Sequence, residues 1–450
     1  MKMNMTSNMK RCILVSLVVV LVVAGIGFAT GLQPVQAEED NGVEIRVDNE
    51  DPGEELTLYM EPEEEVKADF SFVRREEFEI DEVTWIVDGD LESNDHQTII
   101  DFEEEDEYEV ELEIESVEGD QYSDQVTVDV KEDDRGMFLA TIGAGLAVGI
   151  AGMGAGIGVG IAGAAGAGTI AEKPDKFGLS LVFQALPQTQ AIYGLLVAIL
   201  LFLFTGVIGD PGYVSVPIGI MAIGIGLAVG LAGLSAVGQG ISSASGIAAV
   251  SEDSDMFGKG MVFSVLPETQ AIYGLLISIL LMIFSGLLNG GGEGLTEPVA
   301  IVGVGAGLAV GIAGLSGIGQ GIAAGSGVAT VAEDDTMFGR GMVFSVLPET
   351  QAIYGLLIAI LLIVFSGMMN GDGETMTMGM SIAAVGAGLA IGIAVLSGIG
   401  QGITSGSAIA AVSNREETFG KGMIFSVMSE TFAIFGLLIA ILIIVSLGFM

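Results

Sequence analysis

The chain has 450 residues, of which 51% are hydrophobic, and its 58 Asp and Glu against 15 Lys and Arg give a formal net charge of −43. So negative a chain argues against nucleic-acid binding, which requires a basic surface. Cys12 is the only cysteine, so an intrachain disulfide and a zinc site built from several cysteines are both excluded.

Residues 1–37 have the pattern of a secretory signal. Lys and Arg residues precede an apolar run from Cys12 to about Gly31, and small residues near Ala37 offer a cleavage site. At about 20 residues the apolar run is also long enough for an uncleaved signal anchor. Either form of this segment places residues 38–135 outside the cytoplasm.

Residues 38–135 are predicted to form a separate acidic domain. They hold 40 of the 58 acidic residues. Apolar and polar residues alternate in five short runs, at residues 43–47, 56–59, 83–87, 108–114 and 126–130, with turn residues between them. This pattern predicts a small all-β sandwich. The run containing Trp85, its Asp-Gly turn and the later run from Tyr108 resemble a PKD or Ig-like module.

From residue 136 onward the chain is an all-α membrane region built from four near-copies of one unit. Aligning the Phe-Gly pairs at Phe177, Phe257, Phe338 and Phe419 gives spacings of 80, 81 and 81 residues. Each copy has two apolar segments longer than the roughly 20 residues that cross a bilayer, joined by a short polar loop. The sequence therefore predicts four tandem transmembrane hairpins, at residues 136–212, 213–296, 297–377 and 378–450.

The positive charges orient these hairpins. Every Lys or Arg after Arg135 lies in or beside a loop within a hairpin, and the connections between hairpins carry none. By the positive-inside rule the loops within hairpins are cytoplasmic and the connections lie outside. The first segment of each hairpin is rich in glycine, which suits helices crowded on the inside of a ring, whereas the larger side chains of the second suit a lipid-facing layer.

One carboxylate lies within the second apolar segment of copies two, three and four. An ionised side chain inside a membrane costs at least about 2.5–3.5 kcal/mol, so such residues are usually functional. A Gln in the first apolar segment is likewise present in copies two, three and four and absent from copy one. A Thr-Gln-Ala-Ile-Tyr run, by contrast, is intact only in copies one, two and three. We therefore expect three complete sites, each taking Thr, Gln and Tyr from one copy and Gln and Glu from the next. The three carboxylates are Glu268, Glu349 and Glu430.

Leu266-Pro-Glu-Thr-Gln-Ala-Ile-Tyr-Gly-Leu-Leu276 and Leu315-Ser-Gly-Ile-Gly-Gln-Gly321 resemble signatures of the proteolipid (c, or K) subunit of vacuolar-type and archaeal-type rotary ATPases. The resemblance covers residues 136–450 and implies a homo-oligomeric rotor ring in the lipid bilayer. It also implies a stator subunit with half-channels and central-stalk subunits that contact the cytoplasmic loops. The cargo would be Na⁺ or H⁺, and no further cofactor is implied.

The resemblance also implies how each site is built. The ion would be held by Glu, two Gln, Thr and a Leu carbonyl, and a Tyr hydroxyl would brace the Glu. Site one would comprise Leu186, Thr189, Gln190, Tyr193, Gln239 and Glu268. Site two would comprise Leu266, Thr269, Gln270, Tyr273, Gln320 and Glu349. Site three would comprise Leu347, Thr350, Gln351, Tyr354, Gln401 and Glu430.

The interface between hairpin four and hairpin one of the next chain is expected to bind no ion. It would offer Val159, Gln188, Thr431, Phe432 and Phe435 in place of the polar set. For the complete sites Na⁺ is favoured over H⁺, because several oxygen ligands suit a hard cation whereas a proton needs only the carboxylate.

Two other classes of function remain open on the sequence. One is a stand-alone ion transporter, although the polar residues sit at a single depth in the membrane. The other is a structural or pore-forming proteolipid. No nucleophile with a neighbouring base and no phosphate-binding loop occurs in the chain, so we expect any ATP chemistry to belong to partner subunits.

Overall fold

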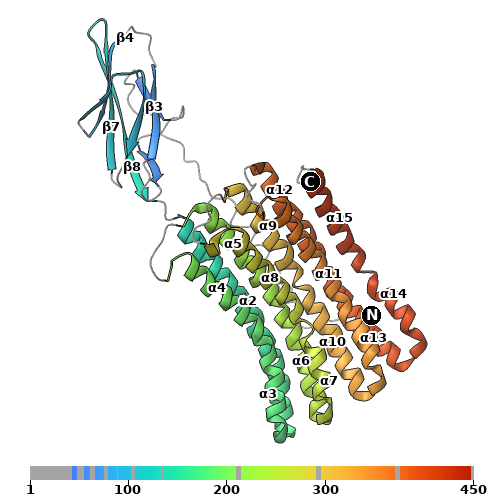
Figure 1. The fold of residues 1–450 in the computed structure, drawn as a ribbon. Coiled ribbons are helices and arrows are strands. Elements are labelled where there is room, and N and C mark those ends of the chain that lie inside the picture. Colours follow the sequence, from blue (N-terminus) through green and yellow to red (C-terminus); the bar gives the residue numbers. More distant parts are fainter. Residues whose placement is uncertain are drawn as a thin grey trace, which may run out of the picture. The chain divides into compact units, whose positions relative to one another are not determined.

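The computed structural model describes residues 43–47, 55–60, 66–74, 80–88, 90–102, 107–132, 135–208, 214–289, 295–369 and 375–446. These residues form two compact units that divide the chain near residue 132, an N-terminal β unit and a C-terminal helical unit (Figure 1). The predicted signal segment, residues 1–37, lies outside the described residues.

The N-terminal unit is an antiparallel β-sandwich, as the alternating pattern predicts. One sheet has the strand order β1-β3-β6 and the other the order β2-β8-β7-β4-β5. The strands are β1 (Val43–Val47), β2 (Glu55–Met60), β3 (Val66–Arg74), β4 (Ile80–Val87), β5 (Asp90–Ser93), β6 (Gln97–Phe102), β7 (Glu107–Ser116) and β8 (Gln121–Glu132). Strands β3, β5 and β6 are absent from the sequence prediction.

The core of the sandwich forms where the two sheets face each other. Phe70 on β3 and Trp85 on β4 are fully buried, and their ring centroids lie 6.0 Å apart in an edge-to-face arrangement. The indole nitrogen of Trp85 donates to the carbonyl of Asp95 at 3.0 Å, which satisfies its only polar group. In the pairing of β4 with β7, apolar residues of the alternating pattern lie opposite each other, and Trp85 lies opposite Leu112 on β7.

Strand β6 offers a matched pair of substitutions for testing this core. Ile100 is 2% exposed, whereas its neighbour Ile99 points outward and is 65% exposed. We expect Ile100→Ala to destabilise the sandwich by about 2–5 kcal/mol and Ile99→Ala to have little effect. Unfolding of the full chain by guanidinium, followed by the fluorescence of its single tryptophan, Trp85, measures both. Equal guanidinium midpoints of unfolding for the two variants would contradict the assignment of Ile100, and not Ile99, to the core.

The C-terminal unit consists of four helical hairpins that follow one another side by side in chain order (Figure 1). The first arms are α2 (Arg135–Glu172), α5 (Val216–Ala232) with α6 (Ala236–Glu252), α9 (Glu297–Ala313) with α10 (Ser316–Glu333), and α12 (Met378–Ala394) with α13 (Ser397–Asn414). The second arms are α3 (Phe177–Ala185) with α4 (Thr189–Phe204), α7 (Phe257–Val265) with α8 (Glu268–Phe284), α11 (Phe338–Phe365), and α14 (Phe419–Val427) with α15 (Glu430–Ser446).

The described helices can supply eight membrane spans. Seven are long and apolar enough to cross a bilayer, and Ser254–Val265 with Glu268–Phe284 makes an eighth if this pair, bent by 41°, counts as one span. Large apolar side chains on the second arms, such as Ile272 and Leu276, are exposed in the single chain, as expected of a surface that faces lipid.

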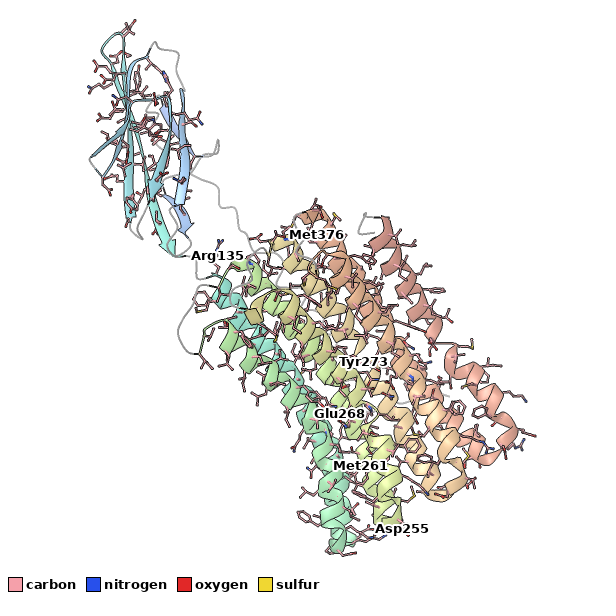
Figure 2. All side chains as sticks on the ribbon, viewed as in Figure 1. Arg135, Asp255, Met261, Glu268, Tyr273 and Met376 are labelled. Atoms are coloured by element: carbon pink, nitrogen blue, oxygen red, sulfur yellow. The ribbon has the colours of Figure 1, made fainter. Side chains whose placement is uncertain are left out.

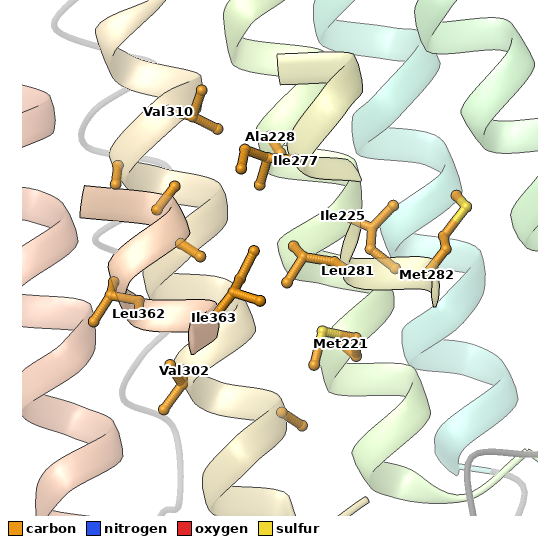
Figure 3. Close-up of a cluster of buried hydrophobic side chains, with 14 of the residues drawn as sticks. Met221, Ile225, Ala228, Ile277, Leu281, Met282, Val302, Val310, Leu362 and Ile363 are labelled. Atoms are coloured by element: carbon orange, nitrogen blue, oxygen red, sulfur yellow. The ribbon is translucent and has the colours of Figure 1, made fainter. Parts of the chain in front are cut away.

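Glycine allows neighbouring first arms to approach each other closely. A Cβ added at Gly307 on α9 would collide with the backbone of Gly224 on α5, and Gly388 on α12 has the same relation to Gly305. Such backbone-to-backbone packing is how helices associate in lipid without a hydrophobic driving force. Between first and second arms the packing is conventional: Met221 and Ile225 on α5 meet Ile277 and Leu281 on α8 (Figure 3).

Proline alone does not explain the break in the second arms. The arm is interrupted at Pro187 in hairpin one and at Pro267 in hairpin two, but α11 continues through Pro348. In hairpin four, α14 ends at Val427 and α15 begins at Glu430 although Ser429 takes the place of proline. The presence of proline therefore does not decide whether a second arm is interrupted.

Candidate functional site

The three carboxylates lie at equivalent points of the second arms. Glu268 is the first residue of α8, Glu430 is the first of α15, and Glu349 follows Pro348 within α11. Figure 2 places Glu268 and Tyr273 partway along the helices, between the hairpin-loop end at Asp255 and the opposite end at Met376 (Figure 2). All three carboxylates are half-buried.

Each carboxylate is bonded by side chains from two consecutive hairpins. In site one, the Tyr193 hydroxyl of hairpin one donates to Glu268 Oε1 at 2.6 Å. From the same hairpin as the carboxylate, Gln239 Nε2 donates to Glu268 Oε2 at 3.2 Å. Sites two and three repeat both bonds: Tyr273 and Gln320 lie 2.8 and 3.0 Å from Glu349, and Tyr354 and Gln401 lie 2.6 and 3.2 Å from Glu430.

A pair of glutamines joins the two hairpins behind each carboxylate. Gln190 Nε2 donates to Gln239 Oε1 at 2.6 Å, and both side chains are fully buried. Gln270 with Gln320, and Gln351 with Gln401, repeat this bond at 2.7 Å. A fully buried amide is costly unless it is hydrogen-bonded, so these paired glutamines fix the geometry of each interface.

A threonine in each site forms a hydrogen bond to a main-chain carbonyl of the same hairpin. Thr189 Oγ1 donates to the Leu186 carbonyl at 3.1 Å and lies 3.1 Å from Gln190 Oε1. The hydroxyls of Thr269 and Thr350 donate in the same way to Leu266 and Leu347, at 3.0 and 2.8 Å. Every residue named by the sequence for sites one, two and three therefore lies in one hydrogen-bonded cluster with its carboxylate or its glutamine pair.

Site three differs in two contacts. Thr350 Oγ1 also donates to Glu430 Oε1 at 2.9 Å, and Ser397 Oγ donates to Gln351 Oε1 at 2.8 Å. Sequence reasoning missed this serine. Its counterparts Ser235 and Ser316 are fully buried, and their hydroxyls have no partner among the described residues. The signal was available, because the same position in copy one, which lacks a site glutamine, is Ala155.

The fourth set of residues is divided between the two ends of the unit. Val159 and Gln188 belong to hairpin one, whereas Thr431, Phe432 and Phe435 belong to hairpin four. Phe432 and Phe435 are 61% and 56% exposed and contact each other edge-to-face. Within one chain these two halves do not meet.

Each complete site has a chemical character that suits one small cation. Its single carboxylate supplies one negative charge, and the remaining oxygens, from hydroxyl, amide and main-chain carbonyl groups, are neutral. A monovalent cation or a proton would neutralise the cluster, and hard oxygen ligands are those that alkali and alkaline-earth cations prefer.

Comparison with known proteins identifies the same family that the sequence resembles. A family model for the ATP synthase C subunit matches the chain four times, at residues 142–201, 223–281, 304–362 and 385–443. The chain is 57% identical over 229 residues to the A-type ATP synthase subunit K of Methanocaldococcus jannaschii, covering 50% of this chain and 96% of that protein.

Two further relatives are more distant. The V-type sodium ATPase subunit K of Enterococcus hirae is 36% identical over 149 residues, covering 33% of this chain and 92% of that protein. The 16 kDa proteolipid of the V-type proton ATPase of Bos taurus is 31% identical over 122 residues, covering 27% of this chain and 75% of that protein. With four matches that span more than half of its residues, the chain belongs to the ATP synthase C subunit family and is a proteolipid subunit of the A-type and V-type rotary ATPases.

Proposed function

We propose that this proteolipid carries Na⁺ through the membrane at three sites per chain, one at each interface between consecutive hairpins. The observation that carries the proposal is the repeated cluster around Glu268, Glu349 and Glu430, in which each carboxylate is bonded by side chains of two hairpins. The relative from Enterococcus hirae is named as a sodium ATPase subunit, which supports the same cargo.

The ligand set favours Na⁺ over H⁺. A cation held at the carboxylate can also take oxygens from Thr, from two Gln and from the Leu carbonyl, all of which lie in the cluster. A proton needs only the carboxylate and does not use the further oxygens of the cluster. Protons are the alternative cargo, and the related bovine protein is named as a proton ATPase proteolipid.

The proposed mechanism follows from the cost of charge in lipid. A carboxylate with its cation bound is neutral as a pair and can face hydrocarbon, whereas an empty one costs at least about 2.5–3.5 kcal/mol there. The empty site is therefore confined to the stator, where half-channels deliver and receive the ion. A membrane potential adds about 2.3 kcal/mol per charge per 100 mV, and this energy turns the ring during synthesis.

Charge distribution supports the orientation in the membrane. We place the loops within hairpins in the cytoplasm, where central-stalk subunits would contact them, and residues 38–135 outside. Every Lys and Arg beyond Arg135 lies in or beside these loops. Lys173 lies at such a loop and forms an ion pair with Glu252 of the next hairpin at 2.8 Å.

Protection against a carbodiimide tests the cargo. Carbodiimides react with a protonated, unoccupied carboxyl group, so bound Na⁺ should slow modification of all three site carboxylates at neutral pH. We expect NaCl to protect Glu268, Glu349 and Glu430, and KCl at equal ionic strength to protect much less. Peptide mass spectrometry reads each site separately. Equal modification in both salts would instead support protons as the cargo.

A further inference from the structure

A serine accompanies the glutamine that the first arm contributes to each complete site. In hairpins two, three and four it lies four residues before that glutamine, at Ser235, Ser316 and Ser397. Hairpin one has Ala155 at this position and Val159 in place of the glutamine. The serine is therefore present only in the hairpins whose first arm contributes to a complete site.

The first arm of each of these three hairpins is interrupted next to the serine. The 3₁₀ turn Gly233–Ser235 separates α5 from α6, and α10 and α13 begin at Ser316 and Ser397, each after a short break in the arm. In hairpin one, by contrast, α2 runs through Ala155 without a break. A 3₁₀ turn has 3.0 residues in place of 3.6, so it changes the direction in which the next side chains face. The serine therefore leaves the arm in a different direction from a residue of an unbroken helix.

The turn that carries the serine packs on the amide of a site glutamine. Each site has a first glutamine, on the second arm of one hairpin, and a second glutamine on the first arm of the next. A Cβ built at Gly317, the residue after Ser316, lies 3.4 Å from the amide carbon of the first glutamine of site two. A Cβ built at Gly398, after Ser397, lies 3.5 Å from the same carbon in site three. The first glutamines are Gln190, Gln270 and Gln351.

Site three shows the hydrogen bond that this placement allows. Ser397 Oγ donates to Gln351 Oε1 at 2.8 Å. The threonine of the same site then lies elsewhere, with Thr350 Oγ1 2.9 Å from Glu430 Oε1. The serine of the next hairpin thus supplies the donor for the amide oxygen of the first glutamine.

In sites one and two the serine hydroxyl is unused. Ser235 and Ser316 are fully buried, and their hydroxyls have no hydrogen-bond partner among the described residues. Such a hydroxyl is costly unless it is bonded. In site two, Thr269 Oγ1 lies 3.2 Å from Gln270 Oε1 and 3.0 Å from the Leu266 carbonyl. Because a hydroxyl has one proton, the threonine cannot donate to both oxygens at once.

We propose that this serine is a positioning residue in all three sites. Its hydroxyl donates to the amide oxygen of the first glutamine, which leaves the threonine's proton for the Leu carbonyl and holds the amide oxygen toward the cation. A carbonyl oxygen has two lone pairs, so it can accept this bond and bind the cation at the same time. The inference rests on the proposed carriage of Na⁺. The pairs are Ser235 with Gln190, Ser316 with Gln270 and Ser397 with Gln351.

The bond also bears on the release of the ion. When the cation leaves, the amide oxygen of the first glutamine keeps the serine's hydrogen bond, so a buried polar group is not left unpaired. The empty site then keeps the arrangement of oxygens that takes up the next ion.

Sodium protection from carbodiimide tests the serine one site at a time. Ser316→Ala removes the hydroxyl from site two, so the NaCl concentration that half-protects Glu349 should rise about threefold to tenfold, the usual effect of losing one hydrogen bond. Half-protection of Glu268 and Glu430 in the same chains should not change. Peptide mass spectrometry reads the three carboxylates separately, so each variant carries two internal controls.

Two further variants and one matched control complete the series. Ser235→Ala should shift half-protection of the carboxylate of site one alone, and Ser397→Ala that of site three alone. Ser278→Ala is the control, because Ser278 is also fully buried but donates to the Ile225 carbonyl, outside the sites, at 2.8 Å. Its loss should leave the half-protecting concentration unchanged at all three carboxylates.

The reaction without sodium separates positioning from a general effect on packing. No hydrogen bond joins Ser316 to Glu349 in the described part of the chain. The rate at which Glu349 is modified in sodium-free buffer, and the dependence of this rate on pH, should therefore be the same in Ser316→Ala and in the wild type. Unchanged half-protection in this variant, a shift at all three carboxylates, or a changed sodium-free profile would each overturn the role of the serine. Wild-type rings that sodium protects at no site would overturn the carriage of Na⁺ itself, and this inference with it.

Discussion

Replacing Glu349 by glutamine should stop ion-coupled transport while leaving the chain folded. Glutamine has nearly the same shape and keeps an oxygen that can accept the Tyr273 hydroxyl, which now lies 2.8 Å from Glu349 Oε1. It carries no charge, so the site neither holds a cation nor responds to the membrane potential. Because every chain of the ring carries the change, each revolution brings a site that cannot bind the ion to the stator.

The expected readouts are quantitative. Carbodiimide modification should fall from three groups per chain to two in Glu349→Gln, and to none when Glu268 and Glu430 are also replaced. ATP-driven Na⁺ uptake by vesicles containing the holoenzyme should fall to the passive leak in each single variant. Glu297→Gln serves as the control, since Glu297 lies in the first turn of α9 and belongs to no site. Uptake that persists at the wild-type rate in Glu349→Gln would contradict the role of this carboxylate.

The internal repeat explains how far sequence reasoning could go in the helical unit. Four copies in one chain make a comparison possible without relatives, and the loss of one polar set from copy one and of the other from copy four indicates a site shared between neighbours. The structure places Tyr193, Gln239 and Glu268 in one cluster as that argument requires. Ser397 was missed because a serine in a helix of small residues is more often a packing residue.

Prediction was weaker where neighbouring strands decide the structure. Strand β6 contains the adjacent pair Ile99 and Ile100, which interrupts the alternation that marks a half-buried strand. Only pairing with β3, where Ala68 lies opposite Ile100, determines which of the two side chains is buried.

Restoring the missing polar groups at the ends of the unit should create a fourth ion site. The substitutions are Val159→Gln and Gln188→Glu on hairpin one, with Phe432→Gln and Phe435→Tyr on hairpin four. Together with the existing Thr431, they reproduce the set that surrounds Glu430, in which Tyr354 and Gln401 lie 2.6 and 3.2 Å from the carboxylate. If hairpin four docks on hairpin one of the next chain, these four residues meet there.

The quadruple variant should bind four Na⁺ per chain in place of three and show a fourth carboxyl group, at residue 188, that sodium protects from carbodiimide. Gln188→Glu alone is the informative partial variant, because it supplies a charge without the neutral ligands that hold a cation. Its carboxyl group should react with carbodiimide, and sodium should not protect it.

A fourth site would also change the energetics of the rotor. Each revolution would move one third more ions, so each ATP made would draw on more of the membrane potential, at about 2.3 kcal/mol per charge per 100 mV. A chain with three sites on four hairpins therefore favours pumping driven by hydrolysis, or synthesis at high potential, relative to the variant. The ratio of Na⁺ moved to ATP hydrolysed in reconstituted vesicles measures this directly. A ratio that stays at the wild-type value although all four carboxylates bind sodium would contradict the link between site number and coupling.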